Sequence, residues 1–163
     1  MTAHIYVLMG GLVGPDGIID SVGMTQLSHR LQKYGVVREL FWSDFDMVEG
    51  EIRALPPEHT IILIGYSGGG SRATWVAKAV YPRKIKLLVA YDPSPAWQMV
   101  PLRDNVEKAL SYHNSAPLMF GLGGGRLVGR QVEIIEVAQQ HLAVQFNEQL
   151  HVRTIEAVQL AVV

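Results

Sequence analysis

The chain has 163 residues, of which 48% are hydrophobic and 18% are charged, and its formal net charge is −1. This length suits one folded domain with a core of its own, and the composition is that of a globular protein. The 14 Lys and Arg residues form no block that could follow a row of phosphates, which argues against nucleic acid binding. We therefore expect a single domain over residues 1–163.

The chain contains no cysteine, which excludes disulfides, a thiol nucleophile and every metal site that uses cysteine. We expect neither a metal ion nor a cofactor. The apolar run 5–13 lacks the basic residues before it, and the cleavage site after it, that mark a secretory signal peptide. No apolar stretch reaches the roughly 20 residues of a membrane-spanning helix. These features predict a cytoplasmic protein without a membrane span.

Short apolar runs alternate with amphipathic stretches along the first half of the chain. In chain order, the pattern predicts strand 5–9, helix 21–34, strand 36–42, helix 46–55, strand 60–64, helix 71–81 and strand 85–90. Strand 60–64 reads Thr-Ile-Ile-Leu-Ile, an unbroken run that is typical of a strand buried on both faces. We expect this strand at the centre of the sheet.

The second half of the chain continues the alternation. The pattern predicts helix 104–112, a short strand or extended loop 117–122, strand 132–137 and helix 147–162. Asp104 and Glu107 would form a capping pair at the start of helix 104–112. The whole pattern predicts an α/β fold, a three-layer αβα sandwich with helices on both faces of a mostly parallel sheet of about five to six strands.

The motif Gly65-Tyr66-Ser67-Gly68-Gly69 fits G-x-S-x-G. A predicted buried strand runs directly into it and an Ala-rich helix runs directly out, which is the setting of a nucleophile elbow. The glycines permit the tight turn that lifts a serine hydroxyl above the sheet. We therefore predict Ser67 as the nucleophile and the backbone N–H of Gly68 as one donor of an oxyanion hole.

The glycine-rich segments have two other interpretations. Residues 65–72 read G-x-x-x-x-G-S-R, which lacks the lysine of a phosphate-binding loop, and a plain turn with an incidental serine stays open. The run from Gly121 to Arg126 fails the dinucleotide-binding pattern because Arg126 stands where the last glycine should be. We interpret residues 121–129 as an internal loop.

With Ser67 placed, the chain resembles the α/β-hydrolase superfamily along nearly its whole length, and in particular its small, lidless members of bacterial and phage type. The motifs that carry the resemblance are Met9-Gly10-Gly11-Leu12, Tyr91-Asp92-Pro93, Pro101-Leu102-Arg103-Asp104-Asn105-Val106 and His141-Leu142-Ala143. The chain has room for about six strands, whereas the usual fold has eight. The two leading strands of the family are the ones that would be missing.

The resemblance implies a Ser-His-Asp catalytic triad. The chain order Ser67, Asp92, His141 is the family's order of nucleophile, acid and base. The segment around Leu12 resembles the family's oxyanion turn, which implies the N–H of Leu12 as the second oxyanion donor. Asp92 departs from the usual pattern, because it follows the strand directly after the elbow and the acid more often lies one strand later.

Position along the chain also favours these partners for Ser67. His141 follows the last predicted strand by a few residues and so reaches the same sheet edge as Ser67. His113 falls in an unplaced loop, and His151 lies inside the last helix as a packing or surface residue. Asp92 ends a strand before Pro93, where a turn cap is the alternative role. The other acidic residues near that edge are Glu133 and Glu136, within the last strand.

These residues predict an esterase-like serine hydrolase that cleaves a small carboxylic ester through an acyl-enzyme, with a thioester or amide as a further possibility. Gly11, Tyr66 and Trp97 are the expected lining of its substrate pocket. The alternative is a non-catalytic binding module that retains the fold, since a fold alone does not fix a function.

Overall fold

The computed structural model describes residues 2–163 apart from residues 12, 15–16, 19–20, 96–97 and 116–122. Its main strands are β1 (Ala3–Met9), β4 (Val36–Phe41), β5 (Thr60–Tyr66), β6 (Leu87–Tyr91), β7 (Ala109–His113) and β8 (Val132–Glu136). They form one sheet in the order β4-β1-β5-β6-β7-β8, and every neighbouring pair is parallel. Two short strands, β2 (Val13–Gly14) and β3 (Gly17–Ile18), pair with each other outside that sheet.

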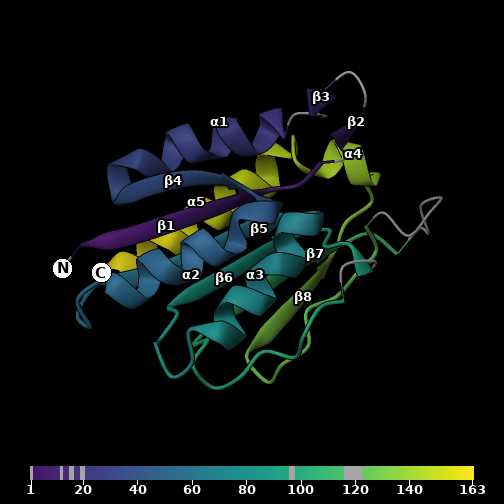
Figure 1. Cartoon of the computed structure of the whole chain (residues 1–163). Coiled ribbons are helices and arrows are strands. Elements are labelled where there is room, and N and C mark those ends of the chain that lie inside the picture. The colour runs from purple at the N-terminus through teal and green to yellow at the C-terminus, as the bar shows by residue number, and fades with distance from the viewer. Residues whose placement is uncertain (1, 12, 15–16, 19–20, 96–97, 116–122) are drawn as a thin grey trace.

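Helices cover both faces of the sheet (Figure 1). One face carries α1 (Val22–Leu31) and α5 (Glu148–Val162), and the other carries α2 (Phe45–Ala54) and α3 (Gly68–Ala79). The shorter helices are η1 (Gln32–Tyr34), η2 (Trp42–Asp44) and α4 (His141–Val144). The predicted three-layer αβα sandwich with a parallel sheet is therefore confirmed, with six strands.

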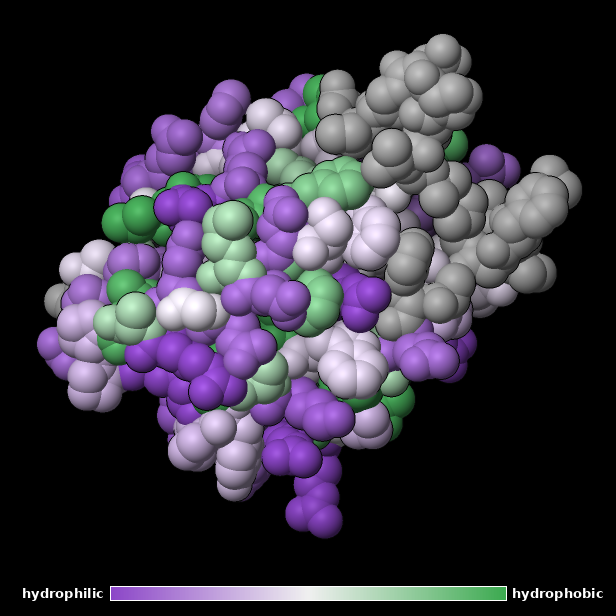
Figure 2. All heavy atoms as spheres, in the orientation of Figure 1, coloured by the Kyte–Doolittle hydropathy of each residue, from purple (hydrophilic) through white to green (hydrophobic). Residues whose placement is uncertain are grey.

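The central strand β5 shows why the sheet needs helices on both sides. Ile62 and Ile64 belong to the apolar core under α1 and α5, whereas Ile61 and Leu63 belong to the core under α2 and α3. All four side chains are almost completely buried. An unbroken apolar strand thus contributes side chains to the cores on both faces of the sheet, as its sequence predicts. The outer face of the molecule over α2 and α3 is largely hydrophilic, with scattered apolar side chains (Figure 2).

The predicted helix 104–112 is wrong. Residues Ala109–His113 form the buried strand β7, which pairs with β6 on one side and β8 on the other. Asp104 starts no helix, and the side chain of Asn105 instead donates to the carbonyl oxygens of Ala77 and Arg83. Pairing with two neighbouring strands outweighs a local capping pattern, because it buries the whole segment. The predicted segment 117–122 lies outside the described residues.

His151 joins α5 to the segment that follows α4. Its Nε2 donates to the carbonyl oxygen of Gln145 at 2.7 Å, and its ring packs edge-on against Tyr91. The side-chain oxygen of Gln145 in turn accepts from the N–H of Gly23 in α1. Burial lowers the pKa of His151 from its usual 6.5, and the carbonyl of Gln145 opposes that shift in part.

The lowered pKa of His151 predicts loss of stability on acidification. The unfolded chain takes up the proton at higher pH than the folded one, so stability falls as the pH drops from 6.5 toward the folded pKa. His151→Gln keeps an amide donor and removes the titrating imidazole. Between about pH 7.5 and about pH 5, a range that spans the usual histidine pKa, the Tm of this variant should therefore fall less than that of the unmodified protein. The exposed His29 provides the control His29→Gln. Equal slopes for His151→Gln and the unmodified chain would contradict the assignment.

No helix in the described ranges is long and apolar enough to cross a membrane.

Candidate active site

Ser67 lies at a sharp turn between β5 and α3. Its backbone angles are φ 54° and ψ −122°, a conformation that non-glycine residues adopt only where the surrounding structure enforces it. A Cβ on Gly65 would collide with the carbonyl of Gly69, and one on Gly69 would collide with that of Leu8. The N–H of Ser67 donates to the carbonyl of Tyr91 at 3.0 Å, which ties the turn to β6. This is the geometry of a strand-to-helix elbow with the serine at its apex.

His141 is the first residue of α4 and lies against Ser67. Its Nε2 is 2.9 Å from the Ser67 hydroxyl oxygen, and its Nδ1 is 2.7 Å from Oδ2 of Asp92. A carboxylate only accepts hydrogen bonds, so Nδ1 carries the proton and Nε2 presents its lone pair to the hydroxyl. The structure thus brings together all three residues that the sequence predicts as a triad.

Asp92 follows β6 directly and is completely buried. Its second oxygen, Oδ1, accepts from the backbone N–H of Gly124 at 2.8 Å and of Asn114 at 3.1 Å. Together with the imidazole of His141, these bonds give the carboxylate three N–H partners. Such bonds to a charged oxygen are stronger than bonds between neutral groups. They fix the carboxylate against the imidazole.

Tyr66 contacts His141 through both its ring and its hydroxyl group. Its ring stacks on the imidazole, with the ring centres 5.1 Å apart, and its hydroxyl donates to the backbone carbonyl of His141 at 3.1 Å. Burial raises the pKa of the Tyr66 hydroxyl far above its usual value, so this group stays a donor. Tyr66 is only 3% exposed, which makes it a support for His141 and leaves little of its surface for a substrate.

The turn after β1 runs beside Ser67. A Cβ on Gly10 would lie 2.7 Å from the Cβ of Ser67, so the backbone approaches the serine as closely as a glycine permits. The hydroxyl of Ser21 donates to the carbonyl of Gly10 at 2.9 Å and anchors the turn. Gly11 follows with φ 143°, half-buried. The predicted oxyanion residue Leu12 lies outside the described residues.

Gly68 and Trp97 complete the positions predicted for the site. Gly68 is the first residue of α3, where N–H groups have no partner within the helix and the helix dipole is positive. Its N–H follows Ser67 directly in the chain, at the start of α3. The predicted pocket residue Trp97 lies outside the described residues.

The alternative partners of Ser67 lie elsewhere. His113 is buried at the end of β7 with neither ring nitrogen in a hydrogen bond. Glu133 pairs with Arg153, and Glu136 accepts from the hydroxyl of Ser115. In the described part of the chain, no group of three or more His, Asp or Glu side chains could hold a metal ion.

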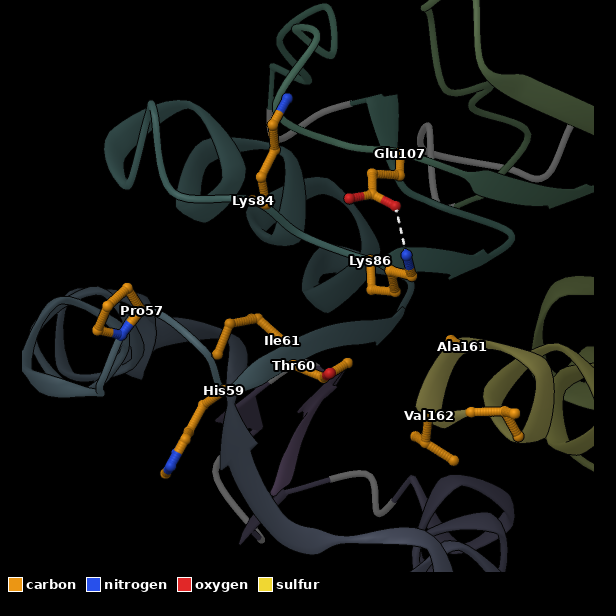
Figure 3. A pocket seen from close by; sticks show the side chains of 10 residues that line it. Pro57, His59, Thr60, Ile61, Lys84, Lys86, Glu107, Ala161 and Val162 are labelled. Atoms are coloured by element: carbon orange, nitrogen blue, oxygen red, sulfur yellow. Dashed lines mark ion pairs between the residues drawn. The ribbon is translucent and has the colours of Figure 1, made fainter. Parts of the chain in front are cut away.

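A pocket of about 250 Å³ lies at the other end of the sheet (Figure 3). His59 and Thr60 at the start of β5 line it, together with the end of α5 and the ion pair between Lys86 and Glu107. Ser67 follows the carboxyl end of β5, so the whole length of the strand separates it from this pocket. The pocket therefore plays no part in the site described above.

Sequence reasoning missed the role of the glycine-rich segment before β8. Gly123 has φ 76°, and a Cβ there would overlap with Oδ2 of Asp92 and Nδ1 of His141. The backbone of Gly123 therefore lies directly on the hydrogen bond between the acid and the base. The signal in the sequence is the run Gly123-Gly124-Gly125, which the pattern alone assigns to a loop.

Gly123→Ala should break the hydrogen bond between Asp92 and His141. Gly124 offers a matched control, because it has the same φ of 76° but its Cβ would meet only the carbonyl of Asn114, at 3.5 Å. Both substitutions carry the same backbone strain, and only the first crowds the pair. The far-downfield proton resonance of the imidazole Nδ1–H should persist in Gly124→Ala and disappear in Gly123→Ala. Its persistence in both variants would show that Gly123 does not contact the pair as described.

No protein-family model matches the chain, and no curated protein does. Solved structures match the chain in fold. A candidate hydrolase of the alpha/beta superfamily from Xanthomonas campestris pv. campestris is 16% identical with a TM-score of 0.63, and the match covers 96% of each chain. A lidless a/b serine hydrolase from Xanthomonas campestris is 15% identical with a TM-score of 0.57, over 97% of this chain and 80% of the other.

A third match is the thioesterase domain of NocB, solved as a covalent complex with a fluorophosphonate analogue of nocardicin G. It is 15% identical with a TM-score of 0.60, over 99% of this chain and 94% of the other. At such low identities the likeness establishes architecture and not chemistry. The chain has the fold of the α/β-hydrolase superfamily.

Proposed function

We propose that the protein is a serine hydrolase that cleaves a carboxylic ester through an acyl-enzyme. The observation that carries the proposal is the position of the His141 imidazole, 2.9 Å from the Ser67 hydroxyl and 2.7 Å from the buried carboxylate of Asp92. A serine hydroxyl is a weak nucleophile at neutral pH and needs a base within hydrogen-bond reach, which in turn needs a partner that orients it.

In the acylation step, Oγ of Ser67 attacks the ester carbonyl carbon while Nε2 of His141 takes the hydroxyl proton. Asp92 holds the imidazole in the required tautomer and stabilises it once it is charged. The negative charge on the carbonyl oxygen is stabilised by the backbone N–H of Gly68 and, in this proposal, of Leu12. His141 then gives its proton to the leaving alcohol, and the C–O bond of the ester breaks.

The acyl-enzyme is hydrolysed by the same groups. His141 takes a proton from a water molecule, and the hydroxide attacks the acyl carbonyl. When the tetrahedral intermediate collapses, the proton returns to Oγ of Ser67 and the carboxylic acid leaves. No cofactor enters either step.

Short esters are the substrates with which to begin. Of the described residues between β6 and β7, only Pro95 is helical, in a 3-10 conformation, and none of those between β7 and β8 is helical. Among these described residues there is no α-helix that could cover Ser67, which leaves little described surface to hold a long acyl chain. The NocB thioesterase domain among the structural matches adds thioesters as a second substrate class to test.

Ser67→Ala should abolish hydrolysis of short p-nitrophenyl esters. Loss of a triad nucleophile costs on the order of 10⁴ to 10⁶ in turnover. A fluorophosphonate probe should label the unmodified protein on Ser67, located by mass spectrometry of the digested adduct. The control is Ser28→Ala, since Ser28 is buried without a hydrogen-bond partner and its loss should leave activity and labelling intact. Unchanged hydrolysis by folded Ser67→Ala, or no label on the unmodified protein, would favour a binding module without chemistry.

His141→Ala should lose nearly as much activity as Ser67→Ala, because members of such a unit fail together rather than additively. Asp92→Asn should cost less, up to about 10⁴-fold, because it disturbs the tautomer but leaves the base in place. The control carboxylate is Asp104, whose backbone carbonyl accepts from Lys84 and whose substitution to Asn should be neutral. If Asp92→Asn were as active as Asp104→Asn, another carboxylate would have to orient His141.

A further inference from the structure

Asn114 directly follows β7 and forms hydrogen bonds toward both the acid and the base of the triad. Its backbone N–H donates to Oδ1 of Asp92 at 3.1 Å. Its side-chain amide nitrogen, Nδ2, donates to the backbone carbonyl oxygen of Gln139, which precedes His141 by two residues. Asn114 is only 4% exposed, so its own polar groups are largely shielded from water. One residue therefore contacts the acid directly and also binds the chain segment that carries the base.

The sheet order explains why the segment that carries the base has to be held in place. His141 follows the outermost strand, β8, whereas Ser67 follows β5, in the order β5-β6-β7-β8. Neighbouring strands lie about 4.8 Å apart, so the ends of β8 and β5 are about 14 Å apart. Only residues 137–140 separate β8 from α4, and on the way toward Ser67 this connection has to pass the end of β7. Asn114 lies at that end.

Two hydrogen bonds to the end of β7 fix the path of this connection. The N–H of Val137 donates to the carbonyl oxygen of His113 at 2.8 Å, which continues the pairing of β7 with β8 by one further bond. The side chain of Asn114 then holds the carbonyl oxygen of Gln139. The main chain is thus attached to β7 until two residues before His141.

We propose that Asn114 is a positioning residue of the triad: its backbone N–H holds the Asp92 carboxylate, and its side-chain amide holds the segment that presents His141 to that carboxylate. The inference rests on the proposed function. The acid follows β6 and the base follows β8, and Asn114 directly follows the strand between them, β7. Because both are bound to one residue, the 2.7 Å separation between Oδ2 of Asp92 and Nδ1 of His141 is kept when β7 moves.

Loss of the side-chain amide would keep all three triad residues but loosen the base. Gln139 is exposed, so water can replace the amide at its carbonyl oxygen, and the connection then loses an attachment to β7. The imidazole of His141 becomes free to move away from the Ser67 hydroxyl. A misplacement of about 1 Å in such a site can lower turnover by about 10²-fold. The loss would therefore appear in the chemical step more than in the stability of the fold.

The test is Asn114→Ala, which removes the amide and keeps the backbone N–H that binds Asp92. We expect kcat for a short p-nitrophenyl ester to fall by about 10- to 100-fold. KM should change by less than about threefold, because a displaced base affects the transition state more than substrate binding. The rate of fluorophosphonate labelling of Ser67 should fall in parallel with kcat. The far-downfield resonance of the His141 Nδ1–H should shift or disappear, which a loss of stability alone would not cause in the folded protein.

Asn105→Ala is the matched control. Asn105 is also a buried asparagine, 1% exposed, and its side-chain amide donates to the carbonyl oxygens of Ala77 and Arg83 at 2.8 and 3.1 Å. It precedes β7 and so lies at the end of the sheet away from Ser67. Its Tm should fall at least as far as that of Asn114→Ala, because two hydrogen bonds are lost. Its kcat should stay within about twofold of the unmodified protein, a small change beside the cost of a displaced base.

The outcomes separate this inference from the proposed function. An unmodified protein that neither hydrolyses esters nor takes up the fluorophosphonate label would overturn both. If Asn114→Ala folds poorly, Asn114→Leu removes the donor and keeps a side chain of similar volume. An active protein in which the folded variant at position 114 loses no more kcat than Asn105→Ala, or keeps the downfield resonance unchanged, would overturn the role of Asn114 alone. The expected result is a fall in kcat and in labelling rate, confined to position 114, with little change in KM.

Discussion

The turn from β5 into α3 is the constraint on which the rest of the site depends. No side chain fits at Gly65 or Gly69, and the backbone of Ser67 takes angles that a residue in a free chain would avoid. Such a conformation persists only because both sides are held, β5 by two neighbouring strands and α3 by the core beneath it. The stability of the central sheet therefore maintains the backbone conformation that holds the Ser67 hydroxyl above the end of β5.

The remaining groups reach Ser67 because parallel strands end at a common edge. Asp92 follows the strand beside β5, and His141 arrives from beyond the outermost strand, β8. The imidazole then has to be held far from its own strand, which explains the stacking of Tyr66 and the hydrogen bond from its hydroxyl. The serine and the ring that supports its base are thus consecutive residues, so any movement of β5 shifts both together.

The sequence predicts those parts of the molecule that follow from local patterns. The unbroken apolar run of β5 and the glycines around Ser67 report burial and tight turning directly, and both predictions agree with the structure. The prediction for the segment that contains β7 was wrong, because Asp104 and Glu107 have the spacing of a helix capping pair. The strand forms through pairing with β6 and β8, which the local sequence pattern does not contain. The contact of Gly123 with Asp92 and His141 could not be predicted. A glycine-rich run indicates that the backbone turns, but it does not indicate which residues that turn contacts.

The way Asp92 is held has a consequence for how this protein tolerates change. Apart from His141, the partners of Asp92 among the described residues are backbone N–H groups, of Asn114 and Gly124. Almost every substitution at those two positions leaves a backbone N–H in place. The position of the Asp92 carboxylate therefore depends on the path of the backbone rather than on the identity of the side chains at these positions. Single substitutions at these two positions would therefore not detect the contribution of the backbone hydrogen bonds to Asp92. An insertion or deletion in the connection between β7 and β8 would detect it, because it moves the N–H donors themselves.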